Sequence, residues 1–257
     1  MKYRILAVFW IIAVFAVPLS AADKSGMFQY STLSALQEGA FDDGLTIGEL
    51  KKHGNFGIGT FDGLDGEMVL YEGTCWQIKS DGSVKASPDN QTSPFAAAVW
   101  FQASSKYDLS SNMTNLKALQ DYLDGIIPSR NLFYAVKIAG VFPSIKTRSA
   151  PKQSKPYPRL ADAFKDQSLF SMTNVSGVII GFYCPDYARG VNMAGFHLHF
   201  ISDDRKSGGH LLDCAFSEAK LEIMAIRNYT LKLPANGTFY RTDLSKDKSS
   251  ELDKIEK

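Results

Sequence analysis

Short apolar runs separated by turn-forming pairs dominate the first half of the chain. The runs at 57–61, 66–71 and 75–79 are separated by Asp-Gly or Glu-Gly pairs, and such pairs favour tight turns between strands. This pattern predicts a β-meander, and the apolar run at 96–101 predicts a further strand. Leucines and isoleucines at helical spacing instead predict a helix at 114–127.

The second half of the chain is again dominated by strand-like runs. We predict strands at 132–139 and 141–147, and later at 176–183 and 220–233, because these runs are rich in apolar and β-branched residues. Short helical turns are expected at 32–36, 45–50 and 160–164. The predicted fold class is α/β in the mixed α+β sense, with two sheet-based lobes whose strands are mixed and mostly antiparallel.

A stretch rich in proline and lysine, 149–158, is the best candidate for a connection between the two lobes. We therefore expect an N-terminal α/β domain at 23–158 and a C-terminal, β-rich, metal-binding domain at 159–257. No internal repeat is evident in the sequence.

The N-terminus has the pattern of a secretory signal peptide. Lys2 and Arg4 precede an apolar run, 5–17, which ends in small residues and is shorter than a membrane span. Cleavage after Ala22 would remove residues 1–22 and change the formal net charge from +1 to −1. We expect an exported protein, periplasmic or extracellular, with no nucleic-acid partner and no membrane association after cleavage. An uncleaved anchor is the alternative.

Three of the four histidines fall within fourteen consecutive positions: His197, His199 and His210. In a strand, residues i and i+2 point to the same face, so His197 and His199 would share one. The turn formers at 202–209 predict a hairpin, which would return His210 opposite this pair. Three neutral imidazoles suit Zn²⁺ and leave a coordination position open, which is typical of a catalytic zinc site rather than a structural one. Ordinary strand histidines are the alternative.

The three cysteines, Cys75, Cys184 and Cys214, are too few for a disulfide scaffold. We interpret all three as packing residues, and a bridge between Cys184 and Cys214 stays an open alternative. Cys214 follows His210 by four residues, but this spacing does not show that it reaches the same metal.

Three blocks of the sequence, taken in order, resemble the α-acetolactate decarboxylase family. They are GIGTFDGLDGE at 57–67, KTRS at 146–149 leading to KPYP at 155–158, and GFHLHF at 195–200 leading to GGH at 208–210. Each block alone is weak, but three in the right order are specific. The likeness covers essentially the whole chain after the signal peptide.

The resemblance implies a two-domain, homodimeric zinc enzyme that converts 2-acetolactate to acetoin and CO₂. It carries the zinc ligands over to His197, His199 and His210, and it places Glu67 and Arg148 in the same pocket. A glutamate near the C-terminus also belongs to the family's site, and spacing aligns it with Glu256. The segment around Glu256 has no distinctive motif, so Glu251 stays an alternative.

The chemistry of decarboxylation explains this choice of residues. Loss of CO₂ from 2-acetolactate leaves an enediolate, and a Zn²⁺ held by neutral imidazoles would act as the Lewis acid that stabilises its charge. The planar fork of Arg148 suits the substrate carboxylate. A carboxylic acid, Glu67 or Glu256, would donate the proton that forms acetoin. Thr60 is either a substrate-binding residue or an ordinary strand residue.

Two other functions are compatible with the same histidines. A secreted zinc hydrolase would use them to activate water, with Glu67 as general base, but the chain has no His-Glu-X-X-His motif. A non-catalytic exported protein that only binds metal would need no role for Arg148.

Overall fold

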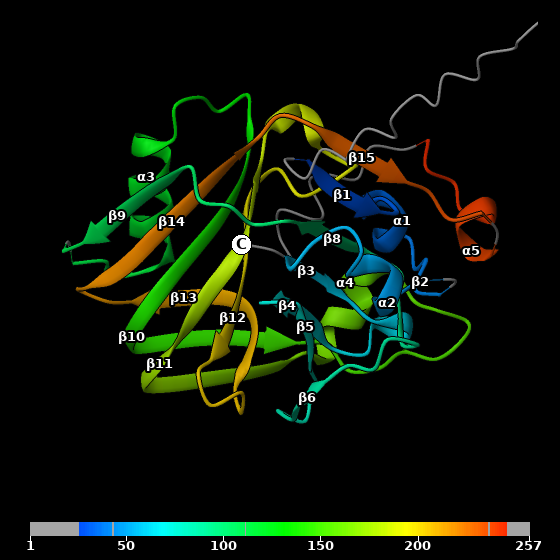
Figure 1. Cartoon of the computed structure of the whole chain (residues 1–257). Coiled ribbons are helices and arrows are strands. Elements are labelled where there is room, and N and C mark those ends of the chain that lie inside the picture. The colour runs from blue at the N-terminus through cyan, green and yellow to red at the C-terminus, as the bar shows by residue number, and fades with distance from the viewer. Residues whose placement is uncertain (1–25, 43, 111, 236, 246–257) are drawn as a thin grey trace, which may run out of the picture.

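The computed structural model describes residues 26–42, 44–110, 112–235 and 237–245. The predicted signal peptide at 1–22 lies outside these residues, as do Glu251 and Glu256. The described residues form a strand-rich α+β fold with two large sheets, as Figure 1 shows. The predicted fold class is therefore confirmed.

The first large sheet has seven strands in the order β15-β1-β8-β3-β4-β5-β6. Their bounds are β1 (Met27–Tyr30), β3 (Phe56–Thr60), β4 (Glu67–Tyr71), β5 (Thr74–Ile78), β6 (Val84–Ala86), β8 (Ala96–Val99) and β15 (Tyr229–Lys232). The predicted meander is confirmed, because β3, β4, β5 and β6 pair consecutively and antiparallel. Strands β1 and β15 pair in parallel, which joins the two ends of the described chain. A small separate sheet pairs β2 (Leu45–Thr46) with β7 (Thr92–Ser93).

The second large sheet has six strands in the order β11-β12-β13-β10-β14-β9. Their bounds are β9 (Ser105–Leu109), β10 (Phe133–Ser149), β11 (Ser168–Cys184), β12 (Gly195–Ser202), β13 (Gly208–Ala215) and β14 (Ala219–Ile226). The prediction of two strands, 132–139 and 141–147, was wrong, because β10 is continuous through Gly140. This residue pairs with Gly177 on one side and with Ala219 on the other. Strand β10 also pairs with β11, so β10, β11, β12 and β13 form a closed circuit of pairings.

The helices are short (Figure 1), and the longest packs its Leu119 and Leu123 into the apolar core of the second sheet. They are α1 (Leu33–Gln37), α2 (Ile47–Leu50), α3 (Leu116–Ile126), α4 (Leu160–Ala163) and α5 (Gly237–Arg241), with 3₁₀ turns η1 (Asp62–Leu64), η2 (Phe164–Asp166) and η3 (Asp186–Ala188). The predicted helix at 114–127 is confirmed as α3, and Asn115 caps it by accepting a hydrogen bond from the Ala118 N–H, 2.8 Å. Within the described ranges, no helix is long and apolar enough to span a bilayer.

The buried faces of the two large sheets pack against each other. Phe56 of β3 meets Phe182 of β11 edge to face, with ring centroids 6.0 Å apart. One apolar cluster contains residues of both sheets, among them Val69, Ala97, Val178 and Ile201. The core therefore fixes how the strands of one sheet lie against those of the other, and the functional site depends on this arrangement.

The predicted division at residue 158 falls between β10 and β11. Both large sheets contain strands from either side of this position, because β15 joins the first sheet, and β9 and β10 join the second. A division into two domains stays a prediction.

Candidate metal centre and active site

The histidine hairpin has the predicted geometry. His197 and His199 lie on β12, and His210 on β13 is the register partner of His199. One ligand atom from each of the three rings lies within 4.8 Å of the others. The Nε2 atoms of His197 and His199 are 3.3 Å apart. The structure therefore brings together the three histidines that the sequence singled out.

The separation of the His197 and His199 nitrogens fits a tetrahedral metal ion. Two nitrogens bound at about 2.0–2.1 Å on a tetrahedron are about 3.3–3.4 Å apart, and the two Nε2 atoms have this separation. Nδ1 of His199 lies 2.9 Å from the backbone carbonyl oxygen of Met68, to which it donates when Nε2 is the ligand atom. Strand β4 thus orients the ring of His199. The donor set, three imidazole nitrogens, suits Zn²⁺ among other divalent transition metals.

The electrostatic surroundings keep the rings uncharged. Burial, and then the positive charge of Arg148, lower the pKa of His197 from 6.5 to about 3. Burial also lowers the pKa of His210 well below 6.5, with a further contribution from Arg148 and the other two histidines. Both rings are therefore neutral near pH 7, the form that binds a metal ion.

Arg148 belongs to the same row of residues across the second sheet. It is the register partner of His210, which in turn pairs with His199, so the row crosses β10, β13 and β12. The guanidinium is buried and lies 4.2 Å from the ring centroid of Phe164. Its Nη1 donates a 3.4 Å hydrogen bond to Oε1 of Gln167. Strand pairing therefore places a fixed positive charge beside the histidines.

The first sheet contributes Glu67 and Thr60, which are partners in the β3–β4 ladder. Oε2 of Glu67 lies 3.5 Å from Nε2 of His199, and Glu67 is buried. The hydroxyl of Thr60 donates a 2.7 Å hydrogen bond to the carbonyl oxygen of Gly66, the residue before Glu67. Thr60 thus lines the cavity and also supports the turn that leads into Glu67.

These side chains enclose a small cavity of about 30 Å³. The polar side of the cavity is formed by Thr60, Glu67, Arg148 and the three histidines, and its other side is apolar. The apolar lining residues are Leu33, Leu36, Leu64, Phe95, Leu160 and Phe164. This apolar side could not be predicted from the sequence, because its residues come from short elements far apart in the chain. The helical turns at 32–36 and 160–164 were predicted, but nothing in their pattern indicated that they face the histidines.

The cysteines take no part in the site. All three are buried and free, so the alternative bridge between Cys184 and Cys214 is not formed. Burial raises the pKa of Cys75 and Cys214 to about 12 and that of Cys184 further still. They are packing residues, as predicted.

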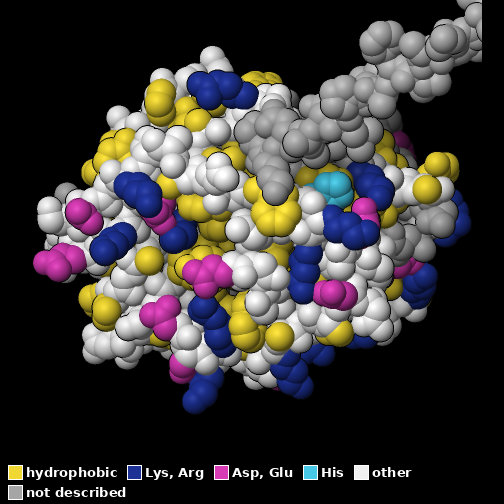
Figure 2. Space-filling view, in the orientation of Figure 1, with side chains coloured by type: hydrophobic (Ala, Val, Ile, Leu, Met, Phe, Trp, Pro, Cys, Tyr) yellow, Lys and Arg dark blue, Asp and Glu magenta, His cyan; other side chains and the backbone are white. Residues whose placement is uncertain are grey.

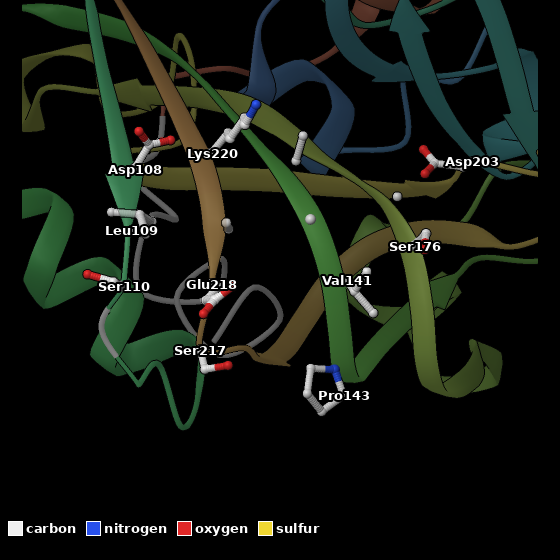
Figure 3. A pocket seen from close by; sticks show the side chains of 14 residues that line it. Asp108, Leu109, Ser110, Val141, Pro143, Ser176, Asp203, Ser217, Glu218 and Lys220 are labelled. Carbon is white, nitrogen blue, oxygen red and sulfur yellow. The ribbon is translucent and has the colours of Figure 1, made fainter.

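A larger concavity of about 810 Å³ lies elsewhere, over strands β9, β10, β11 and β14. Figure 3 shows Val141 and Pro143 on one side of it and Asp108 and Lys220 on another. Its lining residues include no histidine or cysteine. On the face seen in Figure 2, acidic and basic side chains are interspersed. Because the larger concavity has no histidine or cysteine in its lining and the smaller cavity is lined by the histidine triad, we assign the functional site to the smaller cavity.

The fold and this cavity define a class of protein: a strand-rich α+β enzyme whose buried site combines a histidine triad with an arginine and a glutamate. Comparisons with known proteins narrow the class. The sequence profile of the alpha-acetolactate decarboxylase family matches residues 27–246. The chain belongs to this family, and it is a carboxy-lyase.

Individual relatives agree with the family match. The alpha-acetolactate decarboxylase of Methanosarcina mazei is 46% identical over 233 residues, covering 90% of this chain and 80% of the relative. That of Brevibacillus brevis is 41% identical over 241 residues, covering 94% and 84%. The crystal structure of the Bacillus subtilis strain 168 enzyme superimposes with a TM-score of 0.88 at 35% identity, covering 90% of this chain and 99% of that one.

Proposed function

We propose that the protein catalyses the zinc-dependent decarboxylation of 2-acetolactate to acetoin and CO₂. The single observation that carries the proposal is the row of Arg148, His210 and His199, which brings a guanidinium and a metal-binding triad to one cavity wall. Membership of the alpha-acetolactate decarboxylase family supports the choice of substrate. A passive metal binder needs no buried arginine in this row, and the family match favours a decarboxylase over a hydrolase.

His197, His199 and His210 would hold the metal through one ring nitrogen each. When bound, a divalent cation supplies Lewis-acid stabilisation of the negative charge that the departing CO₂ leaves behind. The low pKa values of His197 and His210 keep their nitrogens available for the metal at neutral pH. We propose Zn²⁺ because neutral imidazoles are among its preferred ligands.

Arg148 would bind the carboxylate of the substrate. Its guanidinium offers a planar set of donors that matches a carboxylate, and burial strengthens the charge–charge interaction. Phe164 packs on the guanidinium face, so the hydrogen bonds of the group run from its edges. Arg148 would thus orient the bond that breaks towards the histidine triad.

Glu67 would deliver the proton to the carbon that loses CO₂. It is buried, and its Oε2 is 3.5 Å from a ring nitrogen of the triad, so it lies beside the reacting atoms. Glu256 remains a proposed second glutamate of the site, with Glu251 as its alternative. Export after cleavage at residue 22 and a homodimer likewise stay predictions.

The apolar side of the cavity would receive the methyl groups of 2-acetolactate. Apolar side chains of α1, α4 and η2 line this side of the cavity. Contact with these side chains excludes water while the charge develops.

Chelation tests the proposal directly. Purified full-length protein is assayed for acetoin from 2-acetolactate before chelation, after chelation, and after addition of Zn²⁺, with metal content measured each time. We expect activity to be lost with the metal and to return with Zn²⁺. Activity that survives complete removal of the metal would contradict the metal dependence, and metal-loaded protein that forms no acetoin would contradict the reaction.

A matched histidine variant makes the test specific to the triad. His53 lies outside the triad, where its ring stacks on Phe28 at 3.7 Å. His53→Ala should keep both the metal and the activity. Loss of metal from this variant would place the binding site elsewhere.

A further inference from the structure

Two hydroxyl residues flank Arg148 on β10, and neither of them lines the cavity. Thr147 and Ser149 are both fully buried, with relative exposures of 0%. Successive residues of a strand point to opposite faces, so both hydroxyls lie on the face away from the Arg148 side chain. Buried hydroxyls need hydrogen-bond partners, and both of these donate to backbone carbonyls of other strands.

Thr147 joins β10 to the histidine hairpin. Its hydroxyl donates a 2.8 Å hydrogen bond to the carbonyl oxygen of Gly208, two residues before His210. The β10–β13 ladder shifts register between Lys146 and Thr147, one pair before Arg148–His210. Backbone pairing is irregular at this position, so the side-chain bond of Thr147 supplies a constraint that the ladder lacks.

The close approach of the two strands leaves little space for an alternative register. Gly209 has φ +133°, and a Cβ atom on it would lie 2.5 Å from the carbonyl oxygen of Arg148. Only glycine fits here, because any side chain would strike the β10 backbone. The bond from Thr147 therefore acts beside a position of β13 where a side chain has no room.

Ser149 joins β10 to the other sheet. Its hydroxyl donates a 2.9 Å hydrogen bond to the carbonyl oxygen of Ile78 on β5. Ile78 is the register partner of Glu67. This single bond thus connects the strand of Arg148 to the strand that pairs with Glu67, across the junction of the two sheets.

We propose that Thr147 and Ser149 are positioning residues that set Arg148 relative to the histidine triad and to Glu67. The inference rests on the proposed role of Arg148 in binding the substrate carboxylate. Thr147 fixes the distance from the guanidinium to the metal ligands, and Ser149 fixes its distance to the proton donor. Misplacement of a catalytic group by about 1 Å costs about a hundredfold in rate, so two bonds remote from the substrate have a measurable effect.

Variants of Thr147 test the hydroxyl separately from the shape of the side chain. Thr147→Val keeps the shape and removes the donor, whereas Thr147→Ser keeps the donor and removes a methyl group. We expect kcat/KM to fall about ten- to a hundredfold in Thr147→Val and to stay within about threefold of wild type in Thr147→Ser. Zinc content should be unchanged in both variants, because His197, His199 and His210 are intact.

Ser149→Ala provides an independent measurement should Thr147→Val fail to fold. It should also lower kcat/KM about tenfold with the metal retained. The control is Ser104→Ala, which removes a hydroxyl that donates 3.0 Å to the Ile223 carbonyl away from the cavity. Ser104→Ala should leave kcat/KM unchanged.

A double-mutant cycle decides whether Thr147 acts through Arg148. In an Arg148→Ala background, Thr147→Val should cause no further loss of the residual rate, because the group that it positions is gone. Equal losses in both backgrounds would overturn the inference, as would full activity of Thr147→Val or failure of Thr147→Ser to retain activity. Wild-type protein that does not decarboxylate 2-acetolactate would instead overturn the proposed function.

Discussion

The two walls of the cavity are built in different ways. The polar wall consists of Arg148, His210 and His199, which occupy paired positions on three adjacent strands. The apolar wall consists of side chains from α1, α4 and η2 and their neighbours, which no strand pairing connects to the histidines. Hydrogen-bonded ladders fix the first wall, whereas side-chain packing and a few local backbone hydrogen bonds, such as that from the Leu33 N–H to the Val191 carbonyl oxygen, shape the second.

This difference separates two tasks. A β-ladder restricts the distances between its paired residues to a narrow range. Catalysis needs such restricted distances between the groups that bind the metal and the group that binds the carboxylate. Packed apolar side chains instead set the volume and dryness of a cavity and can shift when a ligand enters. Changes in the polar wall should therefore affect whether the reaction proceeds, and changes in the apolar wall should affect which substrate is used.

The largest effect is expected from loss of a triad histidine. His199→Ala removes one of three ligands and the ring that β4 orients through Met68. Bound zinc and acetoin formation should be lost together, which metal analysis and the activity assay measure on the same sample. A variant that keeps stoichiometric metal would show that His199 is not a ligand.

Replacement of Arg148 should separate metal binding from catalysis. Arg148→Ala should keep its zinc while kcat/KM falls about a hundred- to a thousandfold, because a fixed charge beside the reacting atoms is lost. Arg130→Ala is the control for loss of an arginine outside the site, because Arg130 is exposed and pairs with Asp124. This variant should keep its activity. Undiminished activity of Arg148→Ala would exclude the proposed role.

The polar wall should also make the stability of the metal-free protein depend on pH. His197 has a pKa of about 3 in the folded protein and 6.5 as its ordinary value. Between these values the unfolded chain binds a proton that the folded chain does not, so stability falls as pH falls below 6.5. The slope is at most about 1.4 kcal/mol per pH unit for each such histidine.

Denaturant unfolding of metal-free protein between pH 4.5 and 7 measures this slope. His197→Gln should reduce it by the contribution of one histidine, and comparison with wild type cancels the other titrating groups. An identical slope in both proteins would show that His197 does not resist protonation.

The smallest effect is expected from the apolar wall. Leu36→Ala enlarges the cavity beside the site and should raise the relative kcat/KM for the ethyl homologue of 2-acetolactate over 2-acetolactate itself by about tenfold, since one methylene contributes about 1–3 kcal/mol. Leu119→Ala, a buried leucine of α3 that is absent from the cavity lining, is the matched control and should not change the ratio. An unchanged ratio in Leu36→Ala would contradict the assigned task of this wall.

Only the histidines of the polar wall could be predicted from the local pattern of the sequence. The two-residue spacing of His197 and His199 and the turn formers before His210 suffice to bring the three rings together. Arg148 and Glu67 were identified only through the family resemblance, because their approach to the triad depends on long-range pairing and on the packing of two sheets. No local pattern contains this information.

The apolar wall was not predictable in the same way. Leu36 and Phe164 lie in short helical turns that the sequence indicated, yet their partners are set by tertiary packing. The continuity of β10 was also missed, because Gly140 looks like a break when the strand is viewed alone. Neighbouring ladders on both sides of β10 hold it together through Gly140. The predicted tail glutamates lie outside the described residues.

The closed circuit formed by β10, β11, β12 and β13 has a consequence for how the metal is exchanged. His199 lies between β11 and β13, and His210 lies between β12 and β10, so neither ligand is on an edge that can fray. Freeing β12 or β13 requires breaking ladders on two sides at once, which is a rare event in native proteins. Exchange of the ion should therefore not depend on fraying of these strands, and amide hydrogens of β12 should exchange slowly even in the apo-protein.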